Sequence, residues 1–259
     1  MKKTLQYRNE NVLSYAEYGD KNGAPILVQH GLIASIKDFS LFHLLLGAGL
    51  RVISIARPGY GDSSPYEMRN IAEWGEIVSV LVDQLALPFF DVFGISSGAP
   101  YSYSIAHQLP QRVRNLFILS GTPALYAVNV LALWPYPINK NATIAEMQDL
   151  AYELFFAGLS EEDQEKDDIK NSLRNRCFGV AQDLKLRGVD WGFQLPELET
   201  RVYMRHSQAD EAVPLVTAEM TARLLPNCHF EKRENDTHFS QEVLDDFIRT
   251  VLLPINHKT

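Results

Sequence analysis

The stretch FFDVFGISSGAPYSYSIAHQL, residues 89–109, has the pattern of a strand, a sharp turn and a helix in direct succession. Its apolar start is typical of a buried strand, GISSG of a turn, and the following residues of a helix. Pro100 falls in the first turn of that helix, where a missing amide hydrogen is tolerated. The stretch therefore predicts a parallel strand and its crossover helix in an α/β protein.

The turn contains two serines, and either hydroxyl could be exposed there as a nucleophile. A serine on a sharp strand-to-helix turn has a strained backbone and needs small residues two positions before and after it. Gly94 and Gly98 stand at these positions for Ser96, whereas the β-branched Ile95 precedes Ser97 by two residues. The spacing favours Ser96 as the nucleophile.

Short apolar runs alternate with longer segments of helical period along most of the chain, which is typical of βαβ units and a mostly parallel sheet. The polar turn RNEN at residues 8–11 indicates that the first two strands form an antiparallel hairpin at the sheet edge. The predicted strands are 3–7, 13–18, 25–30, 50–56, 90–95, 114–119, 200–206 and 228–233.

Two helices are predicted to cover the sheet. In residues 69–86 the apolar side chains share one helical stripe, while Glu73, Glu76 and Asp83 are expected to point away from it. Near the end of the chain, apolar residues repeat at spacings of three and four from Val243 to Leu252.

Residues 122–195 break the alternation, because they contain helical patterns and no evident strand. Thr143 and Glu146 form a capping-box signature for a helix that ends near Gly158 and has Met147, Leu150 and Leu154 on one side. The acidic run around Glu161–Asp168 is typical of a solvated helix face, with a docking surface as the alternative. The division expected is a core of residues 1–121 and 196–259 with a helical insertion at 122–195.

Composition limits the class of protein. The 259 residues suit one large α/β domain, and the net charge of −8 argues against a nucleic-acid partner. The start of the chain has no apolar run of signal-peptide length, and no segment has the length and apolarity of a membrane span, so a cytoplasmic protein without a membrane partner is expected. Cys177 and Cys228 are far apart and fit buried thiols rather than a metal or redox pair.

A serine hydroxyl needs a base to take its proton and an acid to orient that base. In doubly wound sheets such groups gather at the carboxyl ends of strands. The loops SQADEAVP (207–214) and NDTHFS (235–240) each follow a predicted strand and supply Asp210 and His238. Glu211 and Asp236 are alternative acids, although Asp236 lies very close to His238 in the sequence.

The other histidines are expected to be packed or surface residues rather than bases. His206 and Asp210 are four residues apart, a spacing that suits a metal pair on a helix, but this segment has a strand-then-loop pattern. We therefore expect neither a metal nor a cofactor. The other histidines expected to be packed or surface residues are His107, His229 and the tail residue His257.

Acyl transfer also requires donors directed at an oxyanion. VQHGLIAS (28–35) follows the third predicted strand, and its glycine lets the backbone turn so that amides point into the site. The expected donors are the backbone amides of Leu32 and Ser97, the latter being the residue after the nucleophile.

Together, HGL (30–32), RPGYGDS (57–63), GISSGAPY (94–101), ADEAVP (209–214) and THFS (237–240) resemble the serine α/β-hydrolase superfamily. The similarity extends through DWGFQLPELETRVYMRHSQADEAVP (190–214) and covers nearly the whole chain. The resemblance implies an eight-stranded sheet with a helical cap over the active site, and it assigns the roles of nucleophile, orienting acid and base to Ser96, Asp210 and His238.

The sequence departs from many relatives at Ala34 in the oxyanion loop, at Ala56 and at Thr237 before the histidine. None of these departures removes a catalytic group. The function expected is a cofactor-free serine hydrolase of the carboxylesterase type, acting on a small apolar ester. The alternatives are a thioesterase, lactonase, amidase or carbon–carbon bond hydrolase, and a ligand-binding signalling protein of the same fold with slow turnover.

Overall fold

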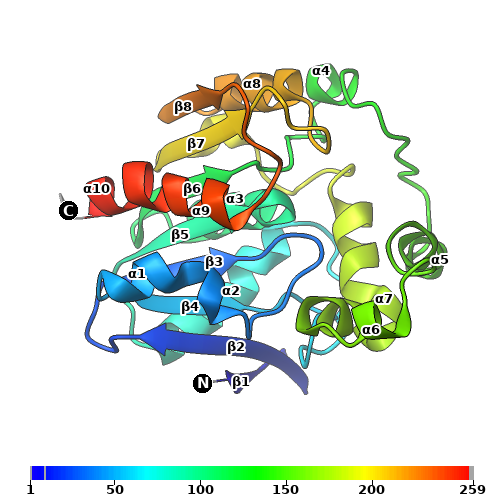
Figure 1. Cartoon of the computed structure of the whole chain (residues 1–259), viewed down its shortest axis with the longest axis horizontal. Coiled ribbons are helices and arrows are strands. Elements are labelled where there is room, and N and C mark those ends of the chain that lie inside the picture. Colours follow the sequence, from blue (N-terminus) through cyan, green and yellow to red (C-terminus); the bar gives the residue numbers. More distant parts are fainter. Residues whose placement is uncertain (1, 9, 257–259) are drawn as a thin grey trace.

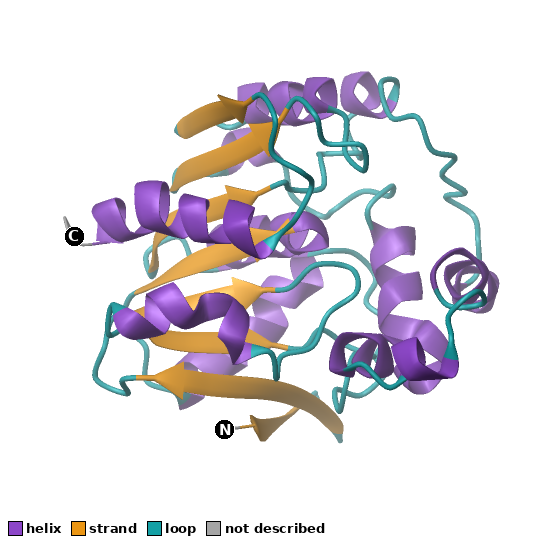
Figure 2. Ribbon diagram, in the orientation of Figure 1, coloured by secondary structure: helices purple, strands orange, loops and turns teal. Residues whose placement is uncertain are grey.

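The computed structural model describes residues 2–8 and 10–256 and contains an eight-stranded sheet (Figures 1 and 2). The strands are β1 (Lys2–Tyr7), β2 (Asn11–Gly19), β3 (Pro25–Gln29), β4 (Arg51–Ile55), β5 (Phe90–Ile95), β6 (Val113–Leu119), β7 (Arg201–Ser207) and β8 (Cys228–Arg233). The longer helices are α2 (Ala72–Gln84), α3 (Ala99–Gln108), α5 (Ile144–Phe155), α7 (Asp167–Leu186), α8 (Leu215–Leu224) and α9 (Gln241–Phe247). The shorter ones are η1 (Phe39–Phe42), α1 (His43–Gly47), η2 (Ser96–Gly98), α4 (Val128–Leu131), α6 (Glu161–Gln164), η3 (Leu195–Glu197), η4 (Ile248–Leu252) and α10 (Leu253–Asn256).

The sheet has the strand order β1-β2-β4-β3-β5-β6-β7-β8. Strands β3 to β8 are parallel to one another, whereas β2 is antiparallel to both β1 and β4. The predicted α/β class, the mostly parallel sheet and the edge hairpin are confirmed. The turn between β1 and β2 includes Asn9, which lies outside the described residues.

Helices cover both faces of the sheet, as Figure 1 shows. On one face α2, α3 and α8 pack over side chains such as Val92 and Leu116, and on the other α1 and α9 pack over Phe93 and Phe117. Alternate residues of a strand point to opposite faces, so a strand covered on both sides is apolar throughout. This is why FFDVF could be recognised as a buried central strand.

The C-terminal helix and the capping box agree with the sequence. Val243 and Leu252 are buried against the sheet, and Thr143 and Glu146 exchange the hydrogen bonds of a capping box at the start of α5. The apolar stripe predicted on α5 is only partly buried: Met147 is buried, but Leu150 and Leu154 are 45% and 61% exposed. The buried side chains of α5 are Met147 and Ala151, which share a cluster with Val180 and Leu184 of α7.

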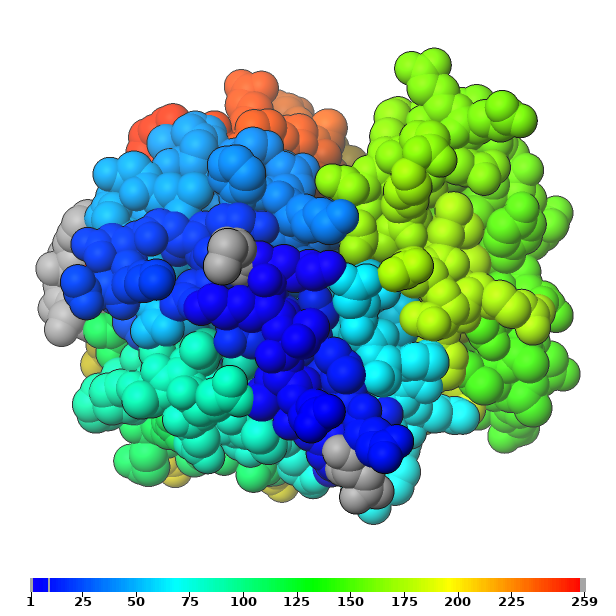
Figure 3. Space-filling view, turned by 90° about the horizontal axis from the view of Figure 1, so that it is seen from below, coloured from blue at the N-terminus to red at the C-terminus, as the bar shows by residue number. Residues whose placement is uncertain are grey.

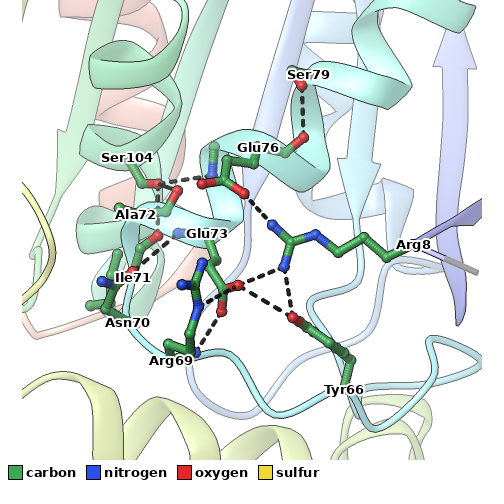
Figure 4. Close-up of polar contacts among 11 residues, drawn as sticks. Arg8, Tyr66, Arg69, Asn70, Ile71, Ala72, Glu73, Glu76, Ser79 and Ser104 are labelled. Atoms are coloured by element: carbon green, nitrogen blue, oxygen red, sulfur yellow. Dashed lines mark hydrogen bonds and ion pairs between the residues drawn. The ribbon is translucent and has the colours of Figure 1, made fainter.

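Glu73 was expected to point away from the apolar stripe, and its side chain is nevertheless buried at the start of α2 (Figure 4). Arg8, at the end of β1, donates to the Glu73 carboxylate, and so does Arg69 at 3.0 Å. The Tyr66 hydroxyl lies 2.6 Å from Arg8 and 3.3 Å from Glu73. The helical period of the sequence indicates which side of α2 is apolar. It does not reveal that Arg8, from a distant part of the chain, pairs with Glu73 on the polar side.

Residues 122–195, called here the helical segment, carry α4, α5, α6 and α7 between β6 and β7. Helices α5, α6 and α7 lie beyond the carboxyl ends of the strands and form a separate lobe in the space-filling view of Figure 3, whereas α4 lies beside α8 (Figure 1). Helix α7 stands nearest the sheet, with α5 outside it (Figure 1). Buried side chains such as Ile36 and Tyr60 of the core pack against Val180 and Leu184 of α7.

Candidate active site

Ser96 stands at the end of β5, at the point where the chain turns into η2 and α3. Its backbone has φ of +50°, a left-handed conformation that is strained for a residue with a Cβ atom. The Ser96 carbonyl accepts a hydrogen bond from the Thr122 amide at 2.9 Å, which ties the turn to the chain after β6. The strained turn places Ser96 directly beyond the carboxyl end of β5, where the sequence pattern indicated a turn.

The two glycines around Ser96 are required by close contacts. A Cβ atom on Gly98 would lie 2.1 Å from the Gln29 carbonyl oxygen, and one on Gly94 would lie 2.3 Å from the Ser102 hydroxyl. Both separations are shorter than any van der Waals contact allows. Since Gly98 has an ordinary helical φ of −74°, space alone excludes a side chain there.

Ser96, His238 and Asp210 form one hydrogen-bonded line, although they come from three distant parts of the chain. His238 Nε2 lies 2.9 Å from Ser96 Oγ, and His238 Nδ1 lies 2.7 Å from Asp210 Oδ2. With its proton on Nδ1, the imidazole donates to the carboxylate and presents Nε2 as an acceptor for the serine hydroxyl. This arrangement can remove a proton from Ser96.

The Asp210 carboxylate is held in a fixed orientation. Its Oδ1 accepts from the backbone amides of Ala212 at 2.9 Å and Val213 at 2.8 Å, which leaves Oδ2 for His238. Burial alone would raise the pKa of the Asp210 carboxyl, but the hydrogen bond from His238, together with the Val213 amide, lowers that pKa below its ordinary value. The side chain is therefore ionised at neutral pH.

His206 supports the acid from the end of β7. Its Nε2 donates to the Val213 carbonyl at 2.8 Å and lies 3.3 Å from Asp210 Oδ2. Burial lowers the pKa of His206, so the ring is neutral next to the carboxylate. Because side chains alternate along a strand, the sequence indicates that His206 points inward. Its contact with Asp210 depends on how the loop after β7 folds back, which the sequence does not reveal.

The other candidate acids and histidines lie elsewhere. The Glu211 side chain is exposed, and Asp236 faces Arg233, with 3.8 Å between the nearest ion-pair atoms. His107 stacks on Phe193 with ring centres 5.0 Å apart, and His229 lies beside Tyr203. His257 is outside the described residues.

The loop after β3 carries Leu32 next to the serine. A Cβ atom on Gly31 would lie 3.8 Å from Ser96 Cβ, so the backbone of this loop touches the serine side chain. Within the described part of the chain, the Leu32 amide donates to no protein acceptor. The Leu32 amide is therefore available to a group that binds beside Ser96.

A buried arginine fixes this loop, and sequence reasoning missed it. Arg57 donates from Nη1 to the His30 carbonyl at 2.7 Å and from Nη2 to the Gly31 carbonyl at 2.9 Å. Its guanidinium also contacts Asp183 on α7, at 2.6 Å from Nη2 and 3.2 Å from Nε. Burial and the Arg57 charge lower the pKa of His30 well below its ordinary value, so that ring is neutral.

Two tyrosines complete the cluster around Asp183. The Tyr101 hydroxyl donates to Asp183 Oδ1 at 2.7 Å. The Tyr60 hydroxyl lies 2.9 Å from Asp183 Oδ2 and 2.8 Å from the Leu32 carbonyl, and its single proton serves these two acceptors. The motif RPGYGDS was recognised in the sequence. Its partner Asp183 could not be predicted, because it lies more than 120 positions away on α7.

None of the helices within residues 2–8 and 10–256 combines the length and the apolar character needed to cross a membrane.

Comparison with known proteins identifies the class. The family described as "alpha/beta hydrolase fold" matches residues 24–243, so the chain belongs to that family and is a hydrolase of that fold. An esterase from Exiguobacterium antarcticum has the same fold, with a TM-score of 0.76 and 18% identity over 99% of this chain and 100% of that one.

Among curated proteins, the chain is similar to a pimeloyl-[acyl-carrier protein] methyl ester esterase of Aromatoleum aromaticum, at 24% identity over 84% of this chain and 92% of the relative. It is also 30% identical to the dihydrolipoyllysine-residue acetyltransferase component of an acetoin cleaving system from Pseudomonas putida. That match covers 54% of this chain and spans only 38% of the length of the relative.

Proposed function

We propose that the protein is a cofactor-free serine hydrolase of the carboxylesterase type, which forms an acyl-enzyme on Ser96. The observation that carries the proposal is the hydrogen-bonded line from Ser96 Oγ through His238 to Asp210, placed on a strained turn at the carboxyl end of β5. Similarity to an esterase over 84% of the chain supports ester chemistry.

In the first half of the reaction, Ser96 Oγ attacks the ester carbonyl carbon while its proton moves to His238 Nε2. The tetrahedral intermediate carries its negative charge on the former carbonyl oxygen, which the amides of Leu32 and Ser97 stabilise. The intermediate then breaks its bond to the alkoxy oxygen. His238 returns the proton to that oxygen, so that an alcohol leaves and the acyl group stays on Ser96.

In the second half, a water molecule gives one proton to His238 and attacks the acyl carbon. Collapse of the second tetrahedral intermediate releases the carboxylic acid and restores the serine hydroxyl. The Asp210 carboxylate keeps the proton on His238 Nδ1 throughout and stabilises the ring while it is positively charged. In this proposal the two reaction steps need no cofactor and no metal. We place the protein in the cytoplasm.

The helical segment forms the cap in this proposal, with residues 1–121 and 196–259 as the core. Its first part, LYAVNVLALWPYP (125–137), is rich in apolar side chains, of which Leu125 and Val130 are buried while Val128 is 80% exposed. Buried members stabilise the packing of the segment on the core, and the others are available to an apolar substrate. A small ester with an apolar acyl chain is therefore the substrate class proposed.

A panel of p-nitrophenyl esters of increasing acyl length tests this proposal, with thioester, lactone and diketone substrates alongside. We expect steady turnover of the esters by the wild type and none above background by Ser96→Ala. Ser97→Ala is the matched control, because it removes a neighbouring hydroxyl but keeps the backbone amide, and it should retain turnover. Turnover that survives Ser96→Ala and is lost in Ser97→Ala would contradict the assignment, and tight binding of these compounds with no turnover would favour the signalling alternative.

A further inference from the structure

Two hydrogen-bond donors in the helical segment are buried without a partner. Arg187 follows the last residue of α7, and its Nε atom has no acceptor among the described residues. Trp134 lies in the coil between α4 and α5, and its Nε1 atom is likewise buried and unpaired. The two groups are neighbours, since the Arg187 guanidinium carbon lies 5.5 Å from the centre of the Trp134 ring.

Unpaired buried donors are uncommon because each loses its hydrogen bonds to water without replacement, and the loss is larger for a charged group. Burial lowers the pKa of Arg187, while the Asp183 charge and Tyr136 act in the opposite direction. A group with a full positive charge and free donors is an incomplete site, and an anion with acceptor oxygens would complete it.

Asp183, one helical turn before Arg187, does not fill this role. Its Oδ1 accepts from Tyr101 and Arg57, and its Oδ2 accepts from Arg57 and lies within hydrogen-bonding distance of Tyr60. Among the described residues, no carboxylate forms an ion pair or hydrogen bond with Arg187. The Asp183 carboxylate is therefore already committed to the loop beside Ser96.

Residues next to the two donors contact both loops that carry the proposed chemistry. On one side, Asp183 connects α7 through Arg57 to the carbonyls of His30 and Gly31. On the other side, the Trp134 ring packs edge to face on Tyr136 at 5.2 Å, and the Tyr136 hydroxyl donates at 3.0 Å to the carbonyl of Glu211. Glu211 is the residue after Asp210, so Asp183 and Tyr136, which flank the two donors, connect them to the Leu32 loop and the Asp210 loop.

We propose that Arg187 and Trp134 bind a carboxylate group of the substrate, so that the protein prefers esters that carry a free carboxylate at the end away from the reacting bond. This inference rests on the proposed function and names its substrate class more closely. The guanidinium offers its nitrogens to the carboxylate oxygens and the indole Nε1–H supplies a further donor. The apolar chain of the ester then runs from Arg187 towards Ser96.

Matched pairs of chromogenic esters test the preference. In the first arm, mono-p-nitrophenyl esters of dicarboxylic acids are compared with their methyl-capped neutral analogues at several chain lengths. In the second arm, acyl esters of ω-hydroxy acids place the carboxylate on the alcohol side instead, and their methyl esters are the neutral partners. We expect kcat/KM for the anionic member of at least one arm to exceed that of its neutral partner by roughly 10- to 100-fold, the value of one hydrogen bond to a charged group.

The ratio of anionic to neutral kcat/KM separates carboxylate binding from a general loss of activity. Arg187→Met should reduce this ratio to about 1, and Arg187→Lys should restore part of it because a positive charge returns without the planar donor pair. Trp134→Phe keeps an aromatic ring but removes the Nε1–H, and it should reduce the ratio severalfold. Arg176→Met is the matched control, since Arg176 is an exposed arginine of α7 paired with Asp149, and it should leave the ratio unchanged.

A binding measurement covers the case in which no ester is turned over. Calorimetry with glutarate and adipate should detect binding to the wild type that is lost in Arg187→Met and kept in Arg176→Met. A wild-type ratio at or below 1 in both arms, or a ratio unaffected by Arg187→Met, overturns the inference and leaves the serine hydrolase proposal standing if neutral esters are hydrolysed. Absence of turnover together with Arg187-dependent dicarboxylate binding would contradict the proposed function but support this site.

Discussion

The carboxylate of Asp183 and the guanidinium of Arg57 form a fully buried ion pair, with 2.6 Å between Oδ2 and Nη2. Asp183 belongs to α7 of the helical segment, whereas Arg57 follows β4 and holds the carbonyls of His30 and Gly31. The position of the loop that carries Leu32 is therefore coupled to the packing of α7. A change in the helical segment can reach the loop that carries Leu32 without touching Ser96.

Asp183→Asn should lower the free energy of unfolding by about 3 kcal/mol, because it leaves the buried Arg57 charge without its counter-charge. Urea unfolding followed by circular dichroism measures the change. Asp149→Asn serves as control, since Asp149 is an exposed carboxylate of the helical segment whose pairing with Arg176 should contribute less than about 1 kcal/mol. Equal effects of the two substitutions would refute the special role of the buried pair.

Gly98→Ala should prevent stable folding or shift the turn, because the new Cβ would lie 2.1 Å from the Gln29 carbonyl oxygen. The strain falls on the main chain of β3 and cannot be relieved by a side-chain rotation. Soluble yield and thermal unfolding check this. Gly47→Ala is the comparison: no atom lies within 4 Å of a Cβ there, and alanine should stabilise that helix by about 0.5–1 kcal/mol.

Ser96→Ala and His238→Ala should each lower kcat by roughly 10⁴- to 10⁶-fold, and the double variant should be no worse than either single one, because the residues act as a unit. Asp210→Asn should leave roughly tenfold or more residual activity than these variants, since the serine and the imidazole remain. Steady-state kinetics on one p-nitrophenyl ester gives all four kcat values. Losses that multiply in the double variant would mean that the two groups act independently.

Glu73→Gln should destabilise the protein by about 2 kcal/mol at pH 7, because Arg8 and Arg69 lose a buried counter-charge. Burial would raise the pKa of Glu73, but the hydrogen bonds from Arg8 and Arg69 lower it below its ordinary value. The contribution of this carboxylate is thus complete above about pH 4.3 and is lost as the pH falls through the lower pKa of the folded state.

Urea unfolding at pH 7 and pH 3 should accordingly find a smaller difference between wild type and Glu73→Gln at the lower pH. Glu76→Gln removes an exposed partner of the same Arg8 and should change stability by less than about 1 kcal/mol at either pH. A wild-type advantage over Glu73→Gln that grows on acidification would show that the sign of the pKa shift is wrong.

The central strands β3, β4, β5 and β6 were predictable because they are covered on both faces and are therefore largely apolar, and β5 with Gly94 and Gly98 also marked the turn at Ser96. The meeting of Asp210 and His238 followed from a general property of parallel sheets, that loops after neighbouring strands share one edge. The environment of Glu73 and the exposure of Leu150 and Leu154 were not predictable, since helical period does not say what each face of a helix contacts. Asp183, Arg187 and Trp134 gave no signal because their surroundings are made by segments far apart in the sequence.

The most direct test of the central claim is the site at which a fluorophosphonate probe attaches, read by tandem mass spectrometry that fragments the chain between Ser96 and Ser97. The account predicts one label per chain, on Ser96, and no label in Ser96→Ala or after acid unfolding. A label on Ser97, or a folded wild-type protein that takes up no label, would contradict the assignment of Ser96 as the nucleophile.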